Sequence, residues 1–276
     1  MPIHLHEDDP DLLYQAIEFT ARETGFNPRL VEKDYFCSVV LEHLAGCDTG
    51  LIFKGGTCLS KVHRDLFRLS EDLDFSIHTP EDATRGERSR SVAEIRTVLD
   101  VLPDRVPGLL TLSELQGANN STQYNAQVGY VSLIDSHTEP VSVEIGVREP
   151  ILLDPCEGSA KTLLLNPIST RVWVEPYPVQ CLNYVEAMAE KLRAAMTRRD
   201  VAIRDYLDVD DAVCKSEFDP QDPTFLDLLK RKLDISGAAT VDISDERVAQ
   251  LERQLESQLA PVLREKDYVE FDLSVR

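Results

Sequence analysis

The segment that most constrains the fold runs from Phe53 to Ile77 and reads FKGGTCLSKVHRDLFRLSEDLDFSI. A short apolar run, Leu51 to Phe53, breaks at Gly55-Gly56, and apolar residues then recur with helical spacing from Thr57 to Phe67. From Asp72 to Ile77, polar and apolar residues alternate, which is the pattern of a strand with one polar and one apolar face. The segment therefore predicts a strand, a glycine turn, a helix and a second strand, within a mixed α/β fold.

Two acids stand on the polar face of the second predicted strand. Asp72 and Asp74 are two residues apart, so their carboxylates project from the same face about 7 Å apart along the backbone. Such a pair supplies part of the oxygen shell that Mg²⁺ or Mn²⁺ prefers. The alternative is a solvated acidic strand face, which is common in a chain with a formal net charge of -20.

The glycine turn complements the acids. At a strand-to-helix turn, the backbone amides of Gly55, Gly56 and Thr57 are placed to face phosphate oxygens. The pattern is not a Walker loop, because no G-x-x-x-x-G-K-[ST] occurs. Phosphoryl or nucleotidyl transfer requires at least a site for the anionic phosphates and, beside it, a site for a cation. The alternative for the glycines is a tight turn without a ligand.

The surrounding sequence predicts further helices and strands. Two helices precede the segment, from Asp11 to Glu23 and, capped by Asn27, from Pro28 to Leu44. After it, we expect a charged helix from Pro80 to Leu102. Three strands should follow, from Leu109 to Leu115, from Gln123 to Ile134 and from Val141 to Val147.

Trp173 and the prolines Pro176 and Pro178 indicate a domain boundary, because the period of the pattern changes after them. We expect a first domain over residues 1–178 and a helical C-terminal domain over residues 179–276. The helices predicted in the second domain are Leu182 to Met196, Val201 to Val213, Pro223 to Leu233 and Ser244 to Leu259.

Composition excludes several classes of protein. The net charge of -20 argues against a protein that coats nucleic acid through a broad basic surface. No apolar run is long enough to span a bilayer, and the first residues are acidic where a secretory signal is basic, so we expect a cytoplasmic protein without a membrane anchor. The six cysteines form no C-x-x-C pair and lack the spacing of a zinc site, which favours free thiols.

Five short blocks, taken in order, resemble the AbiEii and MenT toxins (the AbiEii/AbiGii toxin family) of the polymerase-beta-like nucleotidyltransferase superfamily. The resemblance spans most of the chain, and ordered blocks are more specific than any single block. The blocks are Glu32 to Tyr35, Lys54 to Thr57, Arg68 to Phe75, Glu190 to Ala194 and Arg204 to Asp208.

The resemblance implies a polymerase-beta-like nucleotidyltransferase core with a small mixed sheet, N-terminal helices and a helical C-terminal region. It also implies a toxin of a toxin–antitoxin or phage-defence pair, with a cognate antitoxin as partner. Members similar to this chain transfer a nucleoside monophosphate from an NTP to the 3' end of tRNA, and so block translation.

Carried over residue by residue, the resemblance assigns roles to the motifs. The triphosphate would be bound by Lys54, Gly55, Gly56 and Thr57, with Ser70 against it. Asp72 and Asp74 would bind the metal. In the last two blocks, Lys191 would contact phosphate, and Asp205 or Asp208 would complete the site.

The third metal-binding carboxylate of the superfamily has one natural candidate, Glu144 in VSVEIGV. Alternation places Glu144 on the face opposite Val143 and Ile145, although it is equally well explained as an ordinary acid on a strand face. Lys191 has an alternative too, because the stretch that contains it also fits an amphipathic helix with a solvated basic face.

The sequence is compatible with three functions. The first is transfer to tRNA, and the second is the same transfer to a protein or to a small molecule such as an aminoglycoside. The third is a non-catalytic binding protein with the same fold. For a tRNA acceptor, the clustered cations predict a basic groove on an acidic body; they are Arg64, Arg68, Arg85, Arg88, Arg90, Lys191, Arg193, Arg198, Arg199 and Arg204.

Overall fold

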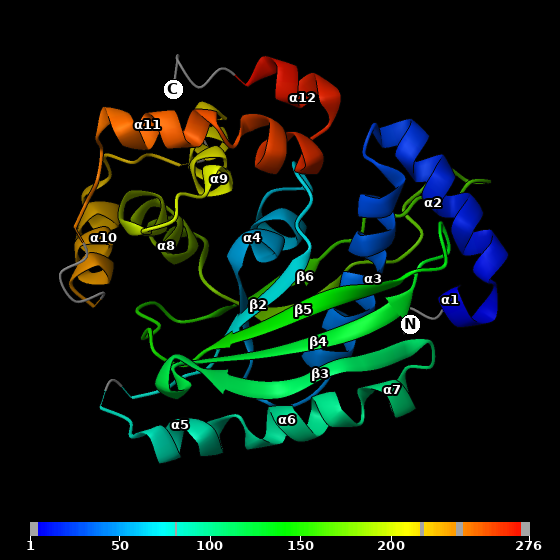
Figure 1. Cartoon of the computed structure of the whole chain (residues 1–276), viewed down its shortest axis with the longest axis horizontal. Coiled ribbons are helices and arrows are strands. Elements are labelled where there is room, and N and C mark those ends of the chain that lie inside the picture. The colour runs from blue at the N-terminus through cyan, green and yellow to red at the C-terminus, as the bar shows by residue number, and fades with distance from the viewer. Residues whose placement is uncertain (1–4, 81, 216–217, 236–239, 272–276) are drawn as a thin grey trace. The chain divides into compact units, whose positions relative to one another are not determined.

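The computed structural model describes residues 5–80, 82–215, 218–235 and 240–271 of the chain (Figure 1). These residues form two compact units. The first comprises Met1–Ile151 and Pro155–Cys181, and the second comprises Leu152–Asp154 and Leu182–Arg276. The division lies three residues after the boundary expected at residue 178.

Unit 1 begins with three helices, α1 (Leu5–Asp8), α2 (Pro10–Thr24) and α3 (Pro28–Ala45). The predicted cap is present: the side chain of Asn27 accepts a hydrogen bond from the Arg29 amide at 2.9 Å, and Pro28 occupies the first turn. Helix α3 is buried on nearly every side from Leu30 to Leu41, which is typical of a helix at the centre of a domain.

A seven-stranded mixed sheet forms the body of unit 1, in the order β3-β4-β5-β2-β1-β7-β6. Strands β1 and β2 are antiparallel, β2 and β5 are parallel, and β5, β4 and β3 continue as antiparallel neighbours. On the other side, β1 is parallel to β7, and β7 is antiparallel to β6. The strands are β1 (Ile52–Lys54), β2 (Asp72–Ser76), β3 (Leu109–Ala118), β4 (Gln123–Val131), β5 (Thr138–Gly146), β6 (Cys156–Ala160) and β7 (Tyr177–Cys181).

One hydrophobic core joins α3 to the sheet. Tyr35 and Phe36 of α3 belong to the same buried cluster as Leu73 and Phe75 of β2 and Ile145 of β5. Because side chains alternate along a strand, burial of these strand residues turns their acidic neighbours to the other face. The predicted alternation of β2 and β5 is confirmed.

The glycine turn leads into a helix that is shorter than expected. Helix α4 (Gly55–Cys58) continues as one π-helical turn, η1 (Leu59–His63), and the chain then turns away. The expectation of a helix to Phe67 is wrong, because Asp65 and Leu66 adopt left-handed φ values of 51° and 57°. Such values end a right-handed helix.

The charged segment after β2 is also broken. A single helix from Pro80 to Leu102 is wrong; the structure has α5 (Arg85–Ser91), α6 (Ala93–Asp100) and α7 (Leu102–Arg105), which run beside β3 (Figure 1). The true start is a capping box, in which Thr84 and Glu87 bond each other's backbone amides. A short 3-10 turn, η2 (Asn119–Ser121), links β3 to β4.

Strands β6 and β7 were not predicted. Pro178 lies within β7, so the prolines do not mark the end of the sheet. Proline lacks an amide donor and usually argues against a strand, and this is why the pattern misled the prediction.

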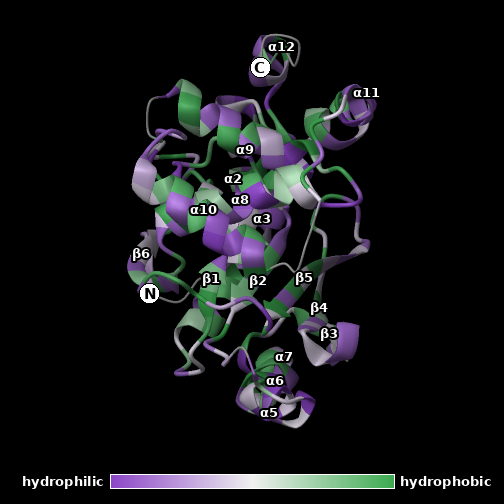
Figure 2. Cartoon of the chain, turned by 90° about the vertical axis from the view of Figure 1, so that its left-hand side faces the viewer, coloured by the Kyte–Doolittle hydropathy of each residue, from purple (hydrophilic) through white to green (hydrophobic). Residues whose placement is uncertain are grey.

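Unit 2 is helical in its described residues. Its elements are α8 (Tyr184–Thr197), α9 (Ile203–Cys214), α10 (Pro223–Ile235), α11 (Asp245–Glu252), η3 (Leu255–Leu259), η4 (Ala260–Val262) and α12 (Glu265–Glu270). Figure 2 shows α10 and α11 striped with hydrophobic and hydrophilic residues, as in helices that bury one face. The helix predicted to Leu259 ends at Glu252 instead. Within the described residues, no helix has the length and apolarity to cross a membrane.

Candidate active site

Three carboxylates lie on one face of the sheet, at the junction of β2 and β5. The parallel register pairs Asp74 with Glu144 directly, and Asp72 with Ser142. Asp72 and Glu144 are exposed, and Asp74 is half-buried. Since paired residues in neighbouring strands point to the same side, Asp72, Asp74 and Glu144 form one acidic group on a rigid support.

A lysine on β1 continues the row of register partners that Asp74 and Glu144 form across the sheet. In β1, Lys54 is the register partner of Asp74. A Cβ atom built on Gly146 would lie 3.9 Å from the Lys54 ammonium nitrogen, so the ammonium reaches over β2 toward β5. The row thus carries an ammonium group and a pair of carboxylates side by side.

Gly55 brings the backbone of the turn against Asp74. Its φ is +77°, and a Cβ atom there would lie 2.1 Å from the Asp74 Oδ2 atom. No side chain fits in that space, and only glycine adopts this φ without strain. The glycine turn and the acidic pair predicted from the sequence are therefore in direct contact.

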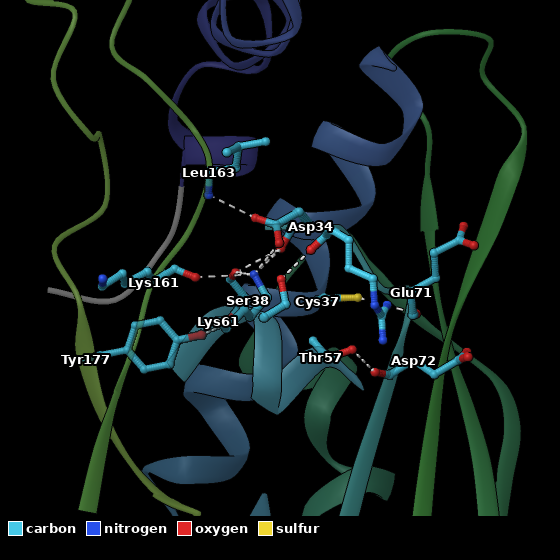
Figure 3. Close-up of polar contacts among 12 residues, drawn as sticks. Asp34, Cys37, Ser38, Thr57, Lys61, Glu71, Asp72, Lys161, Leu163 and Tyr177 are labelled. Carbon is cyan, nitrogen blue, oxygen red and sulfur yellow. Dashed lines mark hydrogen bonds and ion pairs between the residues drawn. The ribbon is translucent and has the colours of Figure 1, made fainter. Parts of the chain in front are cut away.

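Gly56 allows a second close approach, by Arg68 and Ser70. A Cβ atom on Gly56 would lie 2.5 Å from an Arg68 guanidinium nitrogen and 3.2 Å from the Ser70 hydroxyl oxygen. Thr57 is buried, and its hydroxyl donates a hydrogen bond to the carbonyl oxygen of Asp72 (Figure 3). The Thr57 side chain thus holds the turn on β2, while Ser70 stands at the glycines.

A pocket of about 330 Å³ opens over the carboxylates. This volume is at the lower end of the range of about 300–1,000 Å³ for ligand pockets. Besides the three acids, its lining is mostly polar and comes from β4 and β5: Asn125, Ala126, Gln127, Ser142 and Val143.

The block Glu32 to Tyr35 braces α3 rather than facing the pocket, and all four residues are buried. Glu32 accepts hydrogen bonds at 2.7 Å from the Ser132 hydroxyl and the Leu133 amide. Lys33 donates to the carbonyl oxygen of Pro140, and the hydroxyl of Tyr35 lies 2.8 Å from the His6 ring. Each polar side chain therefore joins α3 to a different segment of unit 1.

Asp34 is the centre of a buried network (Figure 3). Its carboxylate forms an ion pair with Lys61 of η1 and accepts a hydrogen bond from the Leu163 amide at 3.0 Å. The Lys61 ammonium also donates to the Ser38 hydroxyl at 2.7 Å. The network fastens η1, and with it the glycine turn, to α3.

In unit 2, the last two blocks meet. Lys191 of α8 lies 2.8 Å from an Asp205 carboxylate oxygen and 3.0 Å from an Asp208 carboxylate oxygen, both on α9. Arg198 lies 2.9 Å from the other Asp205 oxygen. Glu190, which precedes Lys191 on α8, lies 2.9 Å from Lys232 of α10. Lys191, Asp205 and Asp208 thus form one charged cluster, in which the two acids pair with Lys191 and Arg198.

Comparison with known families identifies the chain. Residues 39–274 match the family described as nucleotidyl transferase AbiEii toxin of type IV toxin–antitoxin systems. The chain belongs to the AbiEii family. Comparison with curated protein sequences finds no match.

Two solved structures similar to this AbiEii chain share its fold. The nucleotidyltransferase toxin MenT4 from Mycobacterium tuberculosis H37Rv is 23% identical, with a TM-score of 0.52 over 84% of this chain and 76% of that chain. A putative nucleotidyltransferase from H. pylori is 18% identical, with a TM-score of 0.53 over 91% of this chain and 93% of that chain. The predicted fold class and family resemblance are confirmed.

Two cations expected to line a basic groove on the AbiEii chain are buried instead. Arg64 is 6% exposed and Arg68 is 1% exposed, and both guanidinium groups lie over the Phe67 ring. The Arg68 guanidinium also donates a hydrogen bond to the carbonyl oxygen of the next residue, Leu69. Including these two in an exposed groove was wrong, because each anchors the loop that follows η1.

Sequence reasoning also missed residues of the AbiEii site. Asn125 is the register partner of Glu144 on β4, and Asn125 and Gln127 line the pocket. The alternation of QYNAQVGY carries the signal, since the polar residues of this run share one face of β4. The Asp34–Lys61 pair has no such local signal, because its two partners lie 27 positions apart.

Proposed function

We propose that this AbiEii chain transfers a nucleoside monophosphate from an NTP to the 3' end of tRNA, acting in the cytoplasm as the toxin of a pair whose other member is an antitoxin. The observation that carries the proposal is the register of Asp74 with Glu144, beside Asp72 and the glycine turn. The family supports the transfer chemistry. The acceptor rests on the resemblance to tRNA-modifying members.

The donor set fits a hard divalent cation. Asp72, Asp74 and Glu144 offer carboxylate oxygens, which Mg²⁺ and Mn²⁺ prefer, and they stand on neighbouring strands of one sheet. These three residues would hold the ion. When bound, such an ion neutralises charge on the triphosphate and polarises its phosphorus–oxygen bonds.

The other residues of unit 1 would bind and orient the NTP. The Lys54 ammonium lies in the same row and would pair with phosphate oxygens. The amides of Gly55 and Gly56 would donate to the triphosphate from the start of α4, and the Ser70 hydroxyl stands beside them. For unit 2, the resemblance to the family assigns a role in the reaction to Lys191, Asp205 and Asp208, with Lys191 contacting phosphate.

Incubation with total tRNA and each labelled NTP tests the proposal. We expect one NTP to label tRNA at its 3' end, and we expect the label to fall at least about 100-fold in Asp74→Asn, because a charge-stabilising ligand is lost. The matched control is Asp82→Asn, which removes an exposed acid outside the site. No label with any NTP, together with equal toxicity of parent and Asp72→Ala on expression, would contradict the proposal.

The same experiment tests two alternatives. The net charge of -20 favours a cationic acceptor, such as a basic protein or an aminoglycoside. Label that runs with protein or with a small amine, and not with RNA, would support that alternative. A non-catalytic protein would give no labelled product, and calorimetry would detect no binding of NTP with Mg²⁺.

A further inference from the structure

A second group of potential ligand atoms lies at the other end of α4, apart from the carboxylates. The ligand atoms of Cys58, His63 and Cys181 all lie within 4.8 Å of one another. Cys58 ends α4, His63 ends η1, and Cys181 ends β7. Local spacing gives no sign of the group, because Cys181 is brought there only by the pairing of β7 with β1.

A candidate fourth donor stands beside Cys181, outside this group of three. Cys156 of β6 is the register partner of Cys181, and their sulfur atoms are 3.6 Å apart. Two sulfur ligands at about 2.3 Å from a tetrahedral zinc ion lie about 3.8 Å from each other. The observed separation is therefore close to one edge of such a site, and it is far too long for a disulfide bond, which is about 2.05 Å.

The backbone makes room for this cluster at Gly158 of β6. A Cβ atom there would lie 2.9 Å from the Cys181 sulfur and 2.3 Å from a Val62 methyl carbon. Glycine within a strand often marks such a close approach. Cys58 and Cys181 are buried, at 1% and 0% exposure, so their sulfur atoms are shielded from solvent oxidants.

The contacts among these side chains go beyond apolar packing. The Cys181 thiol also donates a hydrogen bond to the carbonyl oxygen of Cys156 at 3.4 Å, so polar atoms surround this sulfur as well. A cysteine binds metal as the thiolate.

We propose that Cys58, His63, Cys181 and Cys156 form a structural zinc site. Thiolate and imidazole ligands suit zinc and do not suit the magnesium of the carboxylate site. On binding, each thiol that is still protonated releases its proton to solvent as its sulfur donates an electron pair to the ion, and no oxidant or reductant is needed. A closed site with four protein ligands holds its metal without catalysing a reaction.

The zinc would connect three segments that meet here: the end of α4–η1, the β7 strand and the neighbouring β6 strand. Cys58 directly follows Thr57, which holds the glycine turn on β2. The site would thus fix the far end of the helix whose near end carries the glycines. This inference does not depend on the proposed transfer reaction.

Cobalt titration of the reduced full-length protein tests the site. We expect one Co²⁺ per chain, with thiolate-to-cobalt charge-transfer bands and the strong visible bands of tetrahedral cobalt, and displacement of the cobalt by Zn²⁺. Cobalt affinity should fall at least about 100-fold in Cys58→Ser, Cys181→Ser and His63→Gln, and by a smaller factor in Cys156→Ser. The controls are Cys47→Ser and Cys214→Ser, which should bind as the parent does.

A second measurement needs no variant and so does not depend on the folding of buried substitutions. Zn²⁺ should slow alkylation of the half-buried Cys156 in the parent, as read by peptide mass spectrometry, and leave alkylation of the exposed Cys214 unchanged. The proposal is overturned if the reduced parent gives no charge-transfer band, if Cys181→Ser keeps the full band, or if Zn²⁺ leaves all alkylation rates unchanged.

Discussion

Gly55 is held by two separate constraints, its left-handed φ of +77° and its contact with Asp74. We predict that Gly55→Ala costs about 1–3 kcal/mol of unfolding free energy and lowers NTP affinity, since the new methyl group pushes the turn away from the carboxylate. Urea unfolding and calorimetry with NTP measure the two effects.

Gly25 provides the matched control. Its φ is +80°, and a Cβ atom there meets nothing within 4 Å. Gly25→Ala therefore introduces backbone strain without a steric clash. It should lower the free energy of unfolding by about 1 kcal/mol and leave NTP affinity unchanged. Equal NTP affinity in both variants would show that the contact with Asp74 is not part of the binding site.

The titration of Glu32 should make the free energy of unfolding depend on pH. Burial raises the pKa of this carboxyl above its ordinary value of 4.5, against hydrogen bonds from Ser132 and Leu133 that lower it. Because the folded state binds the proton more tightly, the stabilising contribution is complete below pH 4.5 and is lost as the pH rises through the raised pKa.

The variant Glu32→Gln cannot titrate at this position. We expect the parent to lose unfolding free energy relative to Glu32→Gln as the pH rises from 4.5, measured by urea unfolding at several pH values. The exposed Glu23→Gln in α2 is the control for the removal of one carboxyl. A constant difference between parent and Glu32→Gln across the series would contradict the raised pKa.

At the scale of elements, the ion pair between Asp34 and Lys61 joins α3 to η1, and both side chains are almost fully buried. Lys61→Met leaves the Asp34 carboxylate buried without its ammonium partner, and we predict a loss of about 3–5 kcal/mol of unfolding free energy. The double variant Asp34→Leu with Lys61→Met should recover part of that loss, since no buried charge is left.

A surface ion pair from the same region is the control. Lys161 and Asp65 lie 2.8 Å apart, and their side chains are 42% and 84% exposed. Lys161→Met should cost less than about 1 kcal/mol, because solvent screens the pair. If Lys61→Met were as mild as Lys161→Met in urea unfolding, the buried network would not hold η1 in place.

Elements that are determined by neighbouring residues could be predicted from the sequence, and elements that are determined by contacts between distant residues could not. Strands β2 and β5 and the cap at Asn27 are encoded by neighbouring residues, so alternation and capping rules found them. The end of η1 depends on the loop that buries Arg68, and β7 contains a proline that local rules place outside strands. Both depend on contacts distant in sequence, which periodicity does not report.

The candidate site divides in the same way. Alternation identified Asp72 and Asp74 as candidates, and the break in the pattern identified the glycine turn. Glu144 was a candidate because the resemblance implies a third carboxylate on a neighbouring strand. The direct register of Asp74 with Glu144 required the sheet order, in which β5 lies beside β2. The convergence of Cys58, His63 and Cys181 had no sequence signal.

At the scale of the whole molecule, a net charge of -20 opposes contact with a polyanion, so an RNA acceptor needs local cations. Arg199 is exposed and lies two residues after the end of α8. We predict that Arg199→Glu weakens tRNA binding and reduces its salt slope by about 1, while NTP affinity is unchanged. The control is Arg171→Glu, an exposed arginine of unit 1. Equal weakening in both variants would point to net charge instead of a local contact.

We propose that the three carboxylates on β2 and β5 form the catalytic metal site. The most direct measurement is the rate of nucleotide incorporation into acceptor by Glu144→Gln, at saturating NTP with Mg²⁺, beside Glu114→Gln, which removes an exposed acid from β3 of the same sheet. We predict that the rate falls at least about 100-fold in Glu144→Gln and is unchanged in Glu114→Gln. Equal rates in the parent and Glu144→Gln would contradict the assignment.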